Sequence, residues 1–204
     1  DHKDRQMIHR IRRQNPNAIL IVTGCYAQLK PQEISHIDGV DYVLGQDQKF
    51  HLTEFIEQLE NHQSPITNHQ SPITNHQSNI FLSPIREVDD FHHAYSKDDR
   101  TRCFLKVQDG CNYFCSYCTI PLARGKSRNP SIASLVTKAQ EAIDGGAKEI
   151  ILSGVNIGDF GRSTNERFID LLSALDGLQG DYRIRISSCE PNLLSDEIIE
   201  MVAH

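Results

Sequence analysis

The sequence has no tryptophan and only two methionines, and aromatic residues make up 7% of its 204 residues. It also has no long apolar run. The longest aliphatic stretch, residues 18–22, is far shorter than the roughly 20 residues that cross a bilayer. No apolar targeting segment opens the chain. These absences predict a protein without membrane contact, and a cytoplasmic location is the expectation.

The sequence also lacks a surplus of basic residues, because its formal net charge is -6. A protein that coats nucleic acid needs many Lys and Arg side chains against the phosphates. We therefore expect no DNA binding, and any contact with RNA should be local. A hydrophobic content of 38% is enough to bury a core in one ordinary domain or two small ones.

Both ends of the sequence resemble interrupted helices. The amphipathic pattern around Met7, Ile8 and Ile11 is under way close to the first residue, Asp1. Near the other end, Ser195 has the character of an N-cap, and the helix that follows has no stop signal before the sequence ends. We expect the sequence to be part of a longer protein.

Residues 1–60 alternate between helical and extended patterns. We expect helices over residues 1–14, after Pro31 and over 50–59, strands over 18–23 and 41–44, and a turn at residues 24–25. This order predicts an α/β layer over residues 1–60 that is too small to be stable alone.

A seven-residue unit, Asn-His-Gln-Ser-Pro-Ile-Thr, starts at Asn61 and is repeated almost perfectly as far as Ser78. Each copy holds one Ile and one Pro among polar residues, so it offers no apolar seam for a coiled coil. Histidines spaced by seven in such a tract form no preformed metal site. We interpret residues 61–100 as a linker.

Residues 101–204 show a regular order of strands and helices. We expect strands over residues 103–108, 149–153 and 183–187, and helices over 132–144, 167–178 and from 195 onward. Strands separated by helices of this length predict a parallel sheet or a (β/α) barrel. The chemistry of such a barrel lies on the loops that follow its strands.

Three of the six cysteines, Cys111, Cys115 and Cys118, lie within eight residues on the loop after the first of these strands. Three thiolates that close together hold an iron-sulfur cluster with one iron open to another ligand. Structural zinc, which takes a fourth Cys or His, is the alternative. We interpret Cys103 and Cys189 as packing residues.

The spacing Cys-x-x-x-Cys-x-aromatic-Cys, with Tyr117 as the aromatic residue, resembles the signature of radical S-adenosylmethionine enzymes. The resemblance implies a [4Fe-4S] cluster on the three cysteines, with S-adenosylmethionine bound to the open iron and cleaved to a 5′-deoxyadenosyl radical. It also implies that Tyr117 lies near the adenine.

Residues 110–112, 118–121 and 124–128 narrow this resemblance to the methylthiotransferase family. Residues 23–28 resemble the end of that family's N-terminal domain, which makes Cys25 a ligand of a second, auxiliary [4Fe-4S] cluster; the two earlier ligands are absent from the sequence. The resemblance implies a partial N-terminal α/β domain followed by the first half of a radical S-adenosylmethionine (β/α) barrel.

The resemblance also implies a mechanism. One S-adenosylmethionine would donate a methyl group to sulfur on the auxiliary cluster, and a second would yield the radical that activates an adenine C2–H. An electron donor such as flavodoxin or ferredoxin is implied as well.

Residues 153–161 and 185–191 most resemble the branch of the family that acts on N6-threonylcarbamoyladenosine beside the tRNA anticodon. Branches that act on isopentenyladenosine in tRNA or on an aspartate of a ribosomal protein are alternatives. A non-catalytic zinc-binding interaction module is an alternative of another class.

Four residues follow the second and third strands of the expected barrel, where the fold would place S-adenosylmethionine contacts. They are Gly154, Asn156, Ser188 and Glu190. For Gly154 simple turn chemistry is an equal alternative.

Three basic residues, Arg124, Lys126 and Arg128, follow the cysteine loop. Their charge suits a phosphate or a substrate carboxylate. A solvated basic turn is the alternative.

Overall fold

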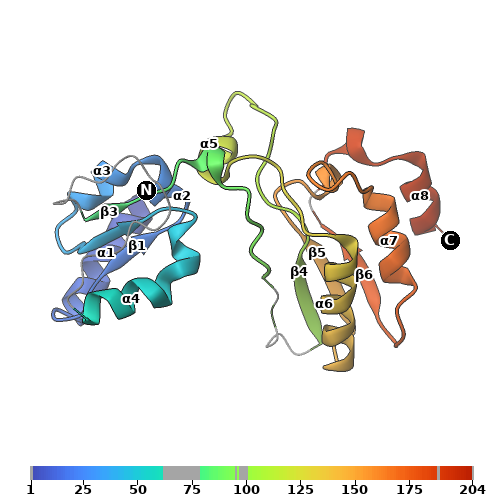
Figure 1. Ribbon diagram of the computed structural model, residues 1–204, viewed down its shortest axis with the longest axis horizontal. Coiled ribbons are helices and arrows are strands. Elements are labelled where there is room, and N and C mark those ends of the chain that lie inside the picture. The colour runs from blue at the N-terminus through green and yellow to red at the C-terminus, as the bar shows by residue number, and fades with distance from the viewer. Residues whose placement is uncertain (1, 62–78, 95, 97–100, 188, 204) are drawn as a thin grey trace. The chain divides into compact units, whose positions relative to one another are not determined.

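The computed structural model describes residues 2–61, 79–94, 96, 101–187 and 189–203, which form two compact units (Figure 1). Unit 1 consists of Asp1–Val88 together with Leu122–Gly125, and unit 2 of Asp89–Pro121 together with Lys126–His204. Most of the repeat tract lies outside the described residues, so its role as a linker stays a prediction.

Unit 1 is built on a small parallel sheet, because short helices carry the chain back between successive strands. The strands, in sheet order, are β1 (Ile21–Thr23), β2 (Tyr42–Leu44) and β3 (Ile80–Phe81). The helices are α1 (His2–Gln14), α2 (Cys25–Leu29), α3 (Pro31–Ser35) and α4 (Leu52–Glu60), with 3₁₀ turns at Gln48–His51 and Ile85–Glu87.

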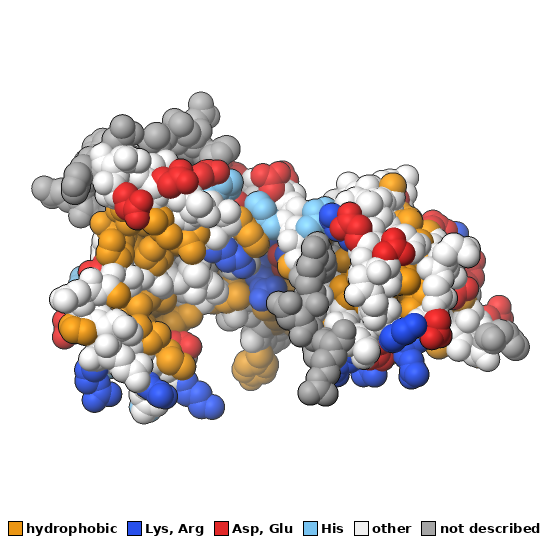
Figure 2. Space-filling view, turned by 90° about the horizontal axis from the view of Figure 1, so that it is seen from below, with side chains coloured by type: hydrophobic (Ala, Val, Ile, Leu, Met, Phe, Trp, Pro, Cys, Tyr) orange, Lys and Arg blue, Asp and Glu red, His pale blue; other side chains and the backbone are white. Residues whose placement is uncertain are grey.

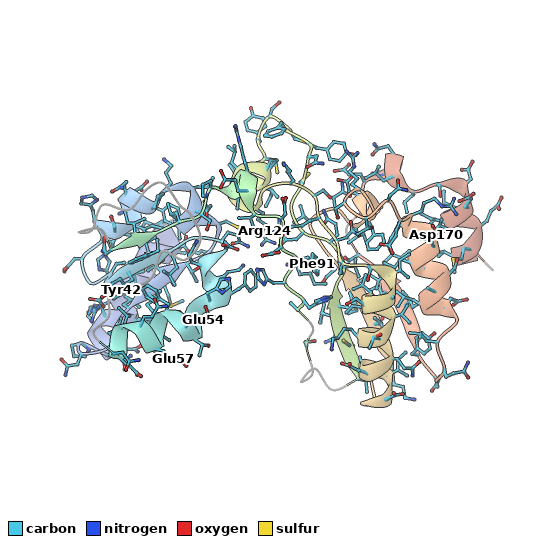
Figure 3. All side chains as sticks on the ribbon, in the orientation of Figure 1. Tyr42, Glu54, Glu57, Phe91, Arg124 and Asp170 are labelled. Atoms are coloured by element: carbon cyan, nitrogen blue, oxygen red, sulfur yellow. The ribbon has the colours of Figure 1, made fainter. Side chains whose placement is uncertain are left out.

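The core of unit 1 is built from apolar side chains that come from different parts of the unit. Its buried members are Ile8, Ala27, Ile34, Ile37 and Val43. Ion pairs from Arg5 to Glu33 and from Arg12 to Asp41 attach α1 to the rest of the unit. The ring of Tyr42, which Figure 3 labels beside α4, meets that of Phe55 edge to face, and the ring centroids are 5.4 Å apart.

One local expectation for unit 1 is wrong. The sequence predicted a turn at residues 24–25, but Cys25 is the first residue of α2. Gly24 precedes it with φ of 114°, a backbone conformation that side chains with a Cβ rarely adopt. The glycine therefore makes the turn by itself, and Cys25 is held at the start of a helix.

Unit 2 is a second parallel sheet, which confirms the predicted α/β class. Its strands, in sheet order, are β4 (Arg102–Lys106), β5 (Glu149–Ser153) and β6 (Arg183–Ile186). The helices are α6 (Ile132–Asp144), α7 (Phe168–Asp176) and α8 (Asp196–Ala203), with 3₁₀ turns at Ile157–Asp159 and Pro191–Leu193. A short helix, α5 (Ile120–Arg124), was not expected.

The core of unit 2 lies between this sheet and its helices. Leu105, Leu135, Leu152 and Leu171 are almost completely buried there. Cys103 is also buried in this core, as expected from its alternation with Leu105. Because all three strands run parallel, their C-terminal ends share one edge of the sheet, and the loops that leave this edge lie near one another.

The surface carries both signs of charge over both units on the face that Figure 2 shows. This agrees with the absence of a basic surplus in the sequence. None of the helices in the described part of the chain combines the length and the apolar character that a membrane span requires.

Candidate functional site

The cysteine loop leaves the sheet at the C-terminal end of β4. The Val107 N–H donates to the carbonyl of Ser153 at 2.9 Å, which continues the pairing with β5 to the start of the loop. Cys111 is buried, whereas Cys115 and Cys118 are exposed. The Cys118 N–H donates to the Cys115 carbonyl at 3.0 Å, so these two thiols belong to one tight turn.

The electrostatics of Cys111 reflect its burial and its neighbours. Burial raises the pKa of the Cys111 thiol, and the neighbouring Asp159, Cys118 and Cys115 raise it further. The Tyr113 N–H points at the sulfur from 3.4 Å and favours the thiolate. Cys111 therefore keeps its proton until a cation displaces it, which is how thiols become metal ligands.

The number and kind of donors on this loop suit an iron-sulfur cluster better than a single structural zinc ion. Within the described ranges no three His, Cys, Asp or Glu side chains, these cysteines included, converge closely enough to hold a metal ion. The comparison therefore rests on the donors: the loop supplies three thiols, and the thiol of Cys103 is buried in the core. Three thiols suit a cluster with one open iron, whereas structural zinc takes four ligands.

A buried ion pair supports the start of the loop. The Asp109 carboxylate lies 2.8 Å from Lys106 Nζ and 3.2 Å from the guanidinium of Arg128. Burial alone would raise the pKa of Asp109, but Lys106, Arg128 and the Gly110 N–H together hold that pKa below its ordinary value. The carboxylate therefore stays charged, and it fixes the loop to the strand that precedes it.

The three basic residues expected to bind substrate have different surroundings. Arg124 groups with unit 1, where its Nε donates to Cys25 Sγ at 3.5 Å (Figure 3). Arg128 is buried in unit 2 against Asp109, and Lys126 is exposed. Their role in substrate binding stays a prediction, but they do not form one basic patch within a single unit.

The residues expected to contact S-adenosylmethionine lie at the ends of β5 and β6. A Cβ on Gly154 would lie 2.8 Å from Ile157 Cγ2 and 3.0 Å from the Gln108 carbonyl oxygen, so close packing requires glycine there. Asn156 is buried, and its Oδ1 accepts from the N–H of the exposed Glu190 at 3.3 Å. Ser188 lies outside the described residues.

Comparison with known proteins gives two family matches. Residues 105–204 match the model of the radical SAM superfamily, and residues 1–45 match that of the uncharacterized protein family UPF0004. The first match covers most of unit 2 and the cysteine loop. Residues 105–204 therefore form a radical S-adenosylmethionine domain.

Individual relatives give a further comparison. The chain is 42% identical to the threonylcarbamoyladenosine tRNA methylthiotransferase MtaB of Bacillus subtilis over 99% of its own length and 43% of the relative. It is 35% identical to MtaB of Thermotoga maritima over 98% of its own length and 43% of the relative. It is 30% identical to the tRNA-2-methylthio-N(6)-dimethylallyladenosine synthase of Clostridium novyi over 95% of its own length and 41% of the relative. The chain thus spans less than half the length of these curated relatives.

The structure adds residues that sequence reasoning missed. Asp159 is buried on the loop after β5, and its Oδ1 lies 2.5 Å from Arg162 Nε and accepts from the Tyr113 hydroxyl at 3.4 Å. Its Oδ2 has no hydrogen-bond partner among the described residues. These contacts tie the cysteine loop to the loop after β5. Asp159 lies within the stretch that resembles the family, but nothing in the sequence indicated its burial.

Gln108 is the second missed residue, and it is completely buried between β4 and the cysteine loop. A single glutamine after a strand carries no signal in the sequence, because its importance depends on which backbone groups surround it.

Proposed function

We propose that this chain holds the radical cluster of an S-adenosylmethionine-dependent methylthiotransferase. The observation that carries this proposal is the loop after β4, where Cys111, Cys115 and Cys118 follow a strand of a parallel sheet and two of the three thiols face solvent. When bound there, the [4Fe-4S] cluster supplies the electron that cleaves S-adenosylmethionine.

In this proposal, residues around the cysteine loop bind and orient S-adenosylmethionine. Tyr117 is fully exposed beside Cys118, and we propose that its ring packs against the adenine. Gly154, Asn156 and Glu190 leave the same edge of the sheet as the cysteine loop, which supports their proposed role in holding S-adenosylmethionine. Ser188 belongs to the same proposed set.

For unit 1 we propose that Cys25 is a ligand of the auxiliary cluster that supplies sulfur. Cys25 is partly exposed at the start of α2, and Arg124 donates to its sulfur. No other cysteine occurs in the first 24 residues, so this sequence supplies one ligand of that cluster.

The substrate that we propose for the whole enzyme is N6-threonylcarbamoyladenosine next to the tRNA anticodon, which would be converted to its 2-methylthio derivative. The relatives from Bacillus subtilis and Thermotoga maritima, both named as threonylcarbamoyladenosine tRNA methylthiotransferases, support this choice. Of the three basic residues, Arg124 and Lys126 are the proposed contacts to substrate, because Arg128 is buried against Asp109. An electron donor such as flavodoxin or ferredoxin is a further proposed partner.

The substrate is tested by mass analysis of tRNA nucleosides from cells that lack the gene. We expect 2-methylthio-N6-threonylcarbamoyladenosine to disappear and its precursor to accumulate. Loss of the methylthio derivative of isopentenyladenosine would identify the other tRNA branch. If no tRNA nucleoside changes and the purified protein holds colourless zinc, the enzyme proposal is wrong and the zinc-binding module is correct.

A further inference from the structure

Gln108 connects the three segments that surround the proposed S-adenosylmethionine site. Its side chain is completely buried at the end of β4, and every polar atom of its amide is bonded. A side-chain amide can accept two hydrogen bonds at its oxygen and donate two from its nitrogen, and Gln108 has partners for all four. No role for this residue followed from the sequence.

The two ends of the amide bind different loops. The oxygen accepts the N–H groups of Val155 and Asn156, at 3.0 and 2.9 Å, on the loop after β5. The nitrogen donates to the Gly110 carbonyl at 2.7 Å and to Ser127 Oγ at 2.9 Å. Turning the amide over would place its oxygen against a carbonyl and its nitrogen against two N–H groups, so the contacts fix its orientation.

The same network continues to the third strand. Asn156, whose N–H is held by Gln108, accepts the Glu190 N–H at 3.3 Å through its own side chain. Gly154 has little room for a Cβ, because such an atom would lie 2.8 Å from Ile157 Cγ2 and 3.0 Å from both the carbonyl oxygen and the Oε1 of Gln108. The loops after β4, β5 and β6 are therefore linked in series, with Gln108 between the cysteines and the other two loops.

We propose that Gln108 is a positioning residue that sets the distance between the cysteine loop and the loop after β5, and thereby the affinity for S-adenosylmethionine. This inference rests on the proposed function for the identity of the ligand. Gln108 is completely buried and its bonds go to Gly110 and Asn156, so it acts through these two residues. Fixing both loops before the ligand arrives reduces the ordering that binding would otherwise require.

The test compares Gln108→Glu with two further variants of the 204-residue chain. A glutamate keeps the acceptor for Val155 and Asn156 but removes the donors to Gly110 and Ser127. Ser127→Ala removes only the hydrogen bond from the Gln108 amide to Ser127 Oγ. This milder variant keeps the test possible if Gln108→Glu fails to fold. Gln46→Glu is the matched control, because Gln46 is a buried amide in unit 1.

Hydrogen exchange in the chain without metal tests the positioning itself. We expect Gln108→Glu to raise exchange at least tenfold at residues 109–112 and 154–157, Ser127→Ala to raise it a few-fold at 109–112 alone, and Gln46→Glu to change neither segment. Unchanged exchange at 109–112 in both the Gln108 and the Ser127 variants would overturn the inference, whether or not the protein is an enzyme.

The second arm measures S-adenosylmethionine binding after anaerobic reconstitution. We expect Gln108→Glu to keep the iron content of the parent chain and to raise the dissociation constant for S-adenosylmethionine at least tenfold. Gln46→Glu should change neither the iron content nor that dissociation constant. Loss of iron in step with affinity would show a merely structural role and contradict the inference. If the parent chain takes up no iron, the proposed function fails, and the exchange measurement still decides the role of Gln108.

Discussion

The two units hold their cysteines by different means. In unit 1, Cys25 lies at the start of a short helix and contacts Arg124, and the ion pairs of α1 are partly exposed. In unit 2 three cysteines share one loop, which rests on a buried ion pair and a buried amide. Unit 2 thus gathers three cysteines on one supported loop, whereas unit 1 presents a single cysteine at the start of a helix.

The largest expected effect concerns the cysteines themselves. After anaerobic reconstitution the chain should hold roughly four irons, the content of one [4Fe-4S] centre. Cys115→Ala should remove nearly all of this iron, because the remaining two thiols cannot hold a cluster. Cys25→Ala should change the iron content little. Iron that survives Cys115→Ala and disappears with Cys25→Ala would reverse the assignment of the two units.

The second effect compares buried with exposed charge. Asp109→Asn leaves the Arg128 guanidinium without its buried counter-charge, which should cost about 3 kcal/mol of unfolding free energy. Asp41→Asn breaks the partly exposed pair with Arg12 in unit 1 and should cost less than about 1 kcal/mol. Denaturant titration followed separately in each unit by hydrogen exchange measures both. An equal loss of unfolding free energy in Asp109→Asn and Asp41→Asn would show that burial does not make the Asp109 pair stronger than the Asp41 pair.

The smallest effect concerns the segment that carries Arg124. Gly125 has φ of 78°, and a Cβ there would lie 2.6 Å from the Ile85 carbonyl oxygen. Gly146 has φ of 97° with nothing within 4 Å of the added atom, so Gly146→Ala measures the backbone strain alone.

We expect Gly125→Ala to cost about 1–2 kcal/mol more than Gly146→Ala, because the clash is added to the strain. The cost should appear as faster hydrogen exchange at residues 122–125. Equal costs would mean that the close approach of Gly125 to Ile85 does not hold this segment in unit 1.

Much of the fold followed from local patterns in the sequence. The helix over residues 132–144 and the strand over 149–153 have the predicted bounds, because apolar periodicity and the Gly145–Gly146 stop are local signals. Helix α5 was missed because five residues are too few to show a period. The turn predicted at Cys25 was wrong because only Gly24 adopts the turn conformation.

For the candidate site, the sequence by itself determined the kind of chemistry. The spacing of Cys111, Cys115 and Cys118 places three thiols on one loop, and that spacing is a property of the chain alone. The tertiary structure decided which side chains support the loop and what surrounds Arg124 and Arg128. Gln108 and Asp159 each take part of their contacts from segments about 20 to 50 residues away. Such contacts exist only after the strands pair, because parallel pairing brings distant loops to one edge of the sheet.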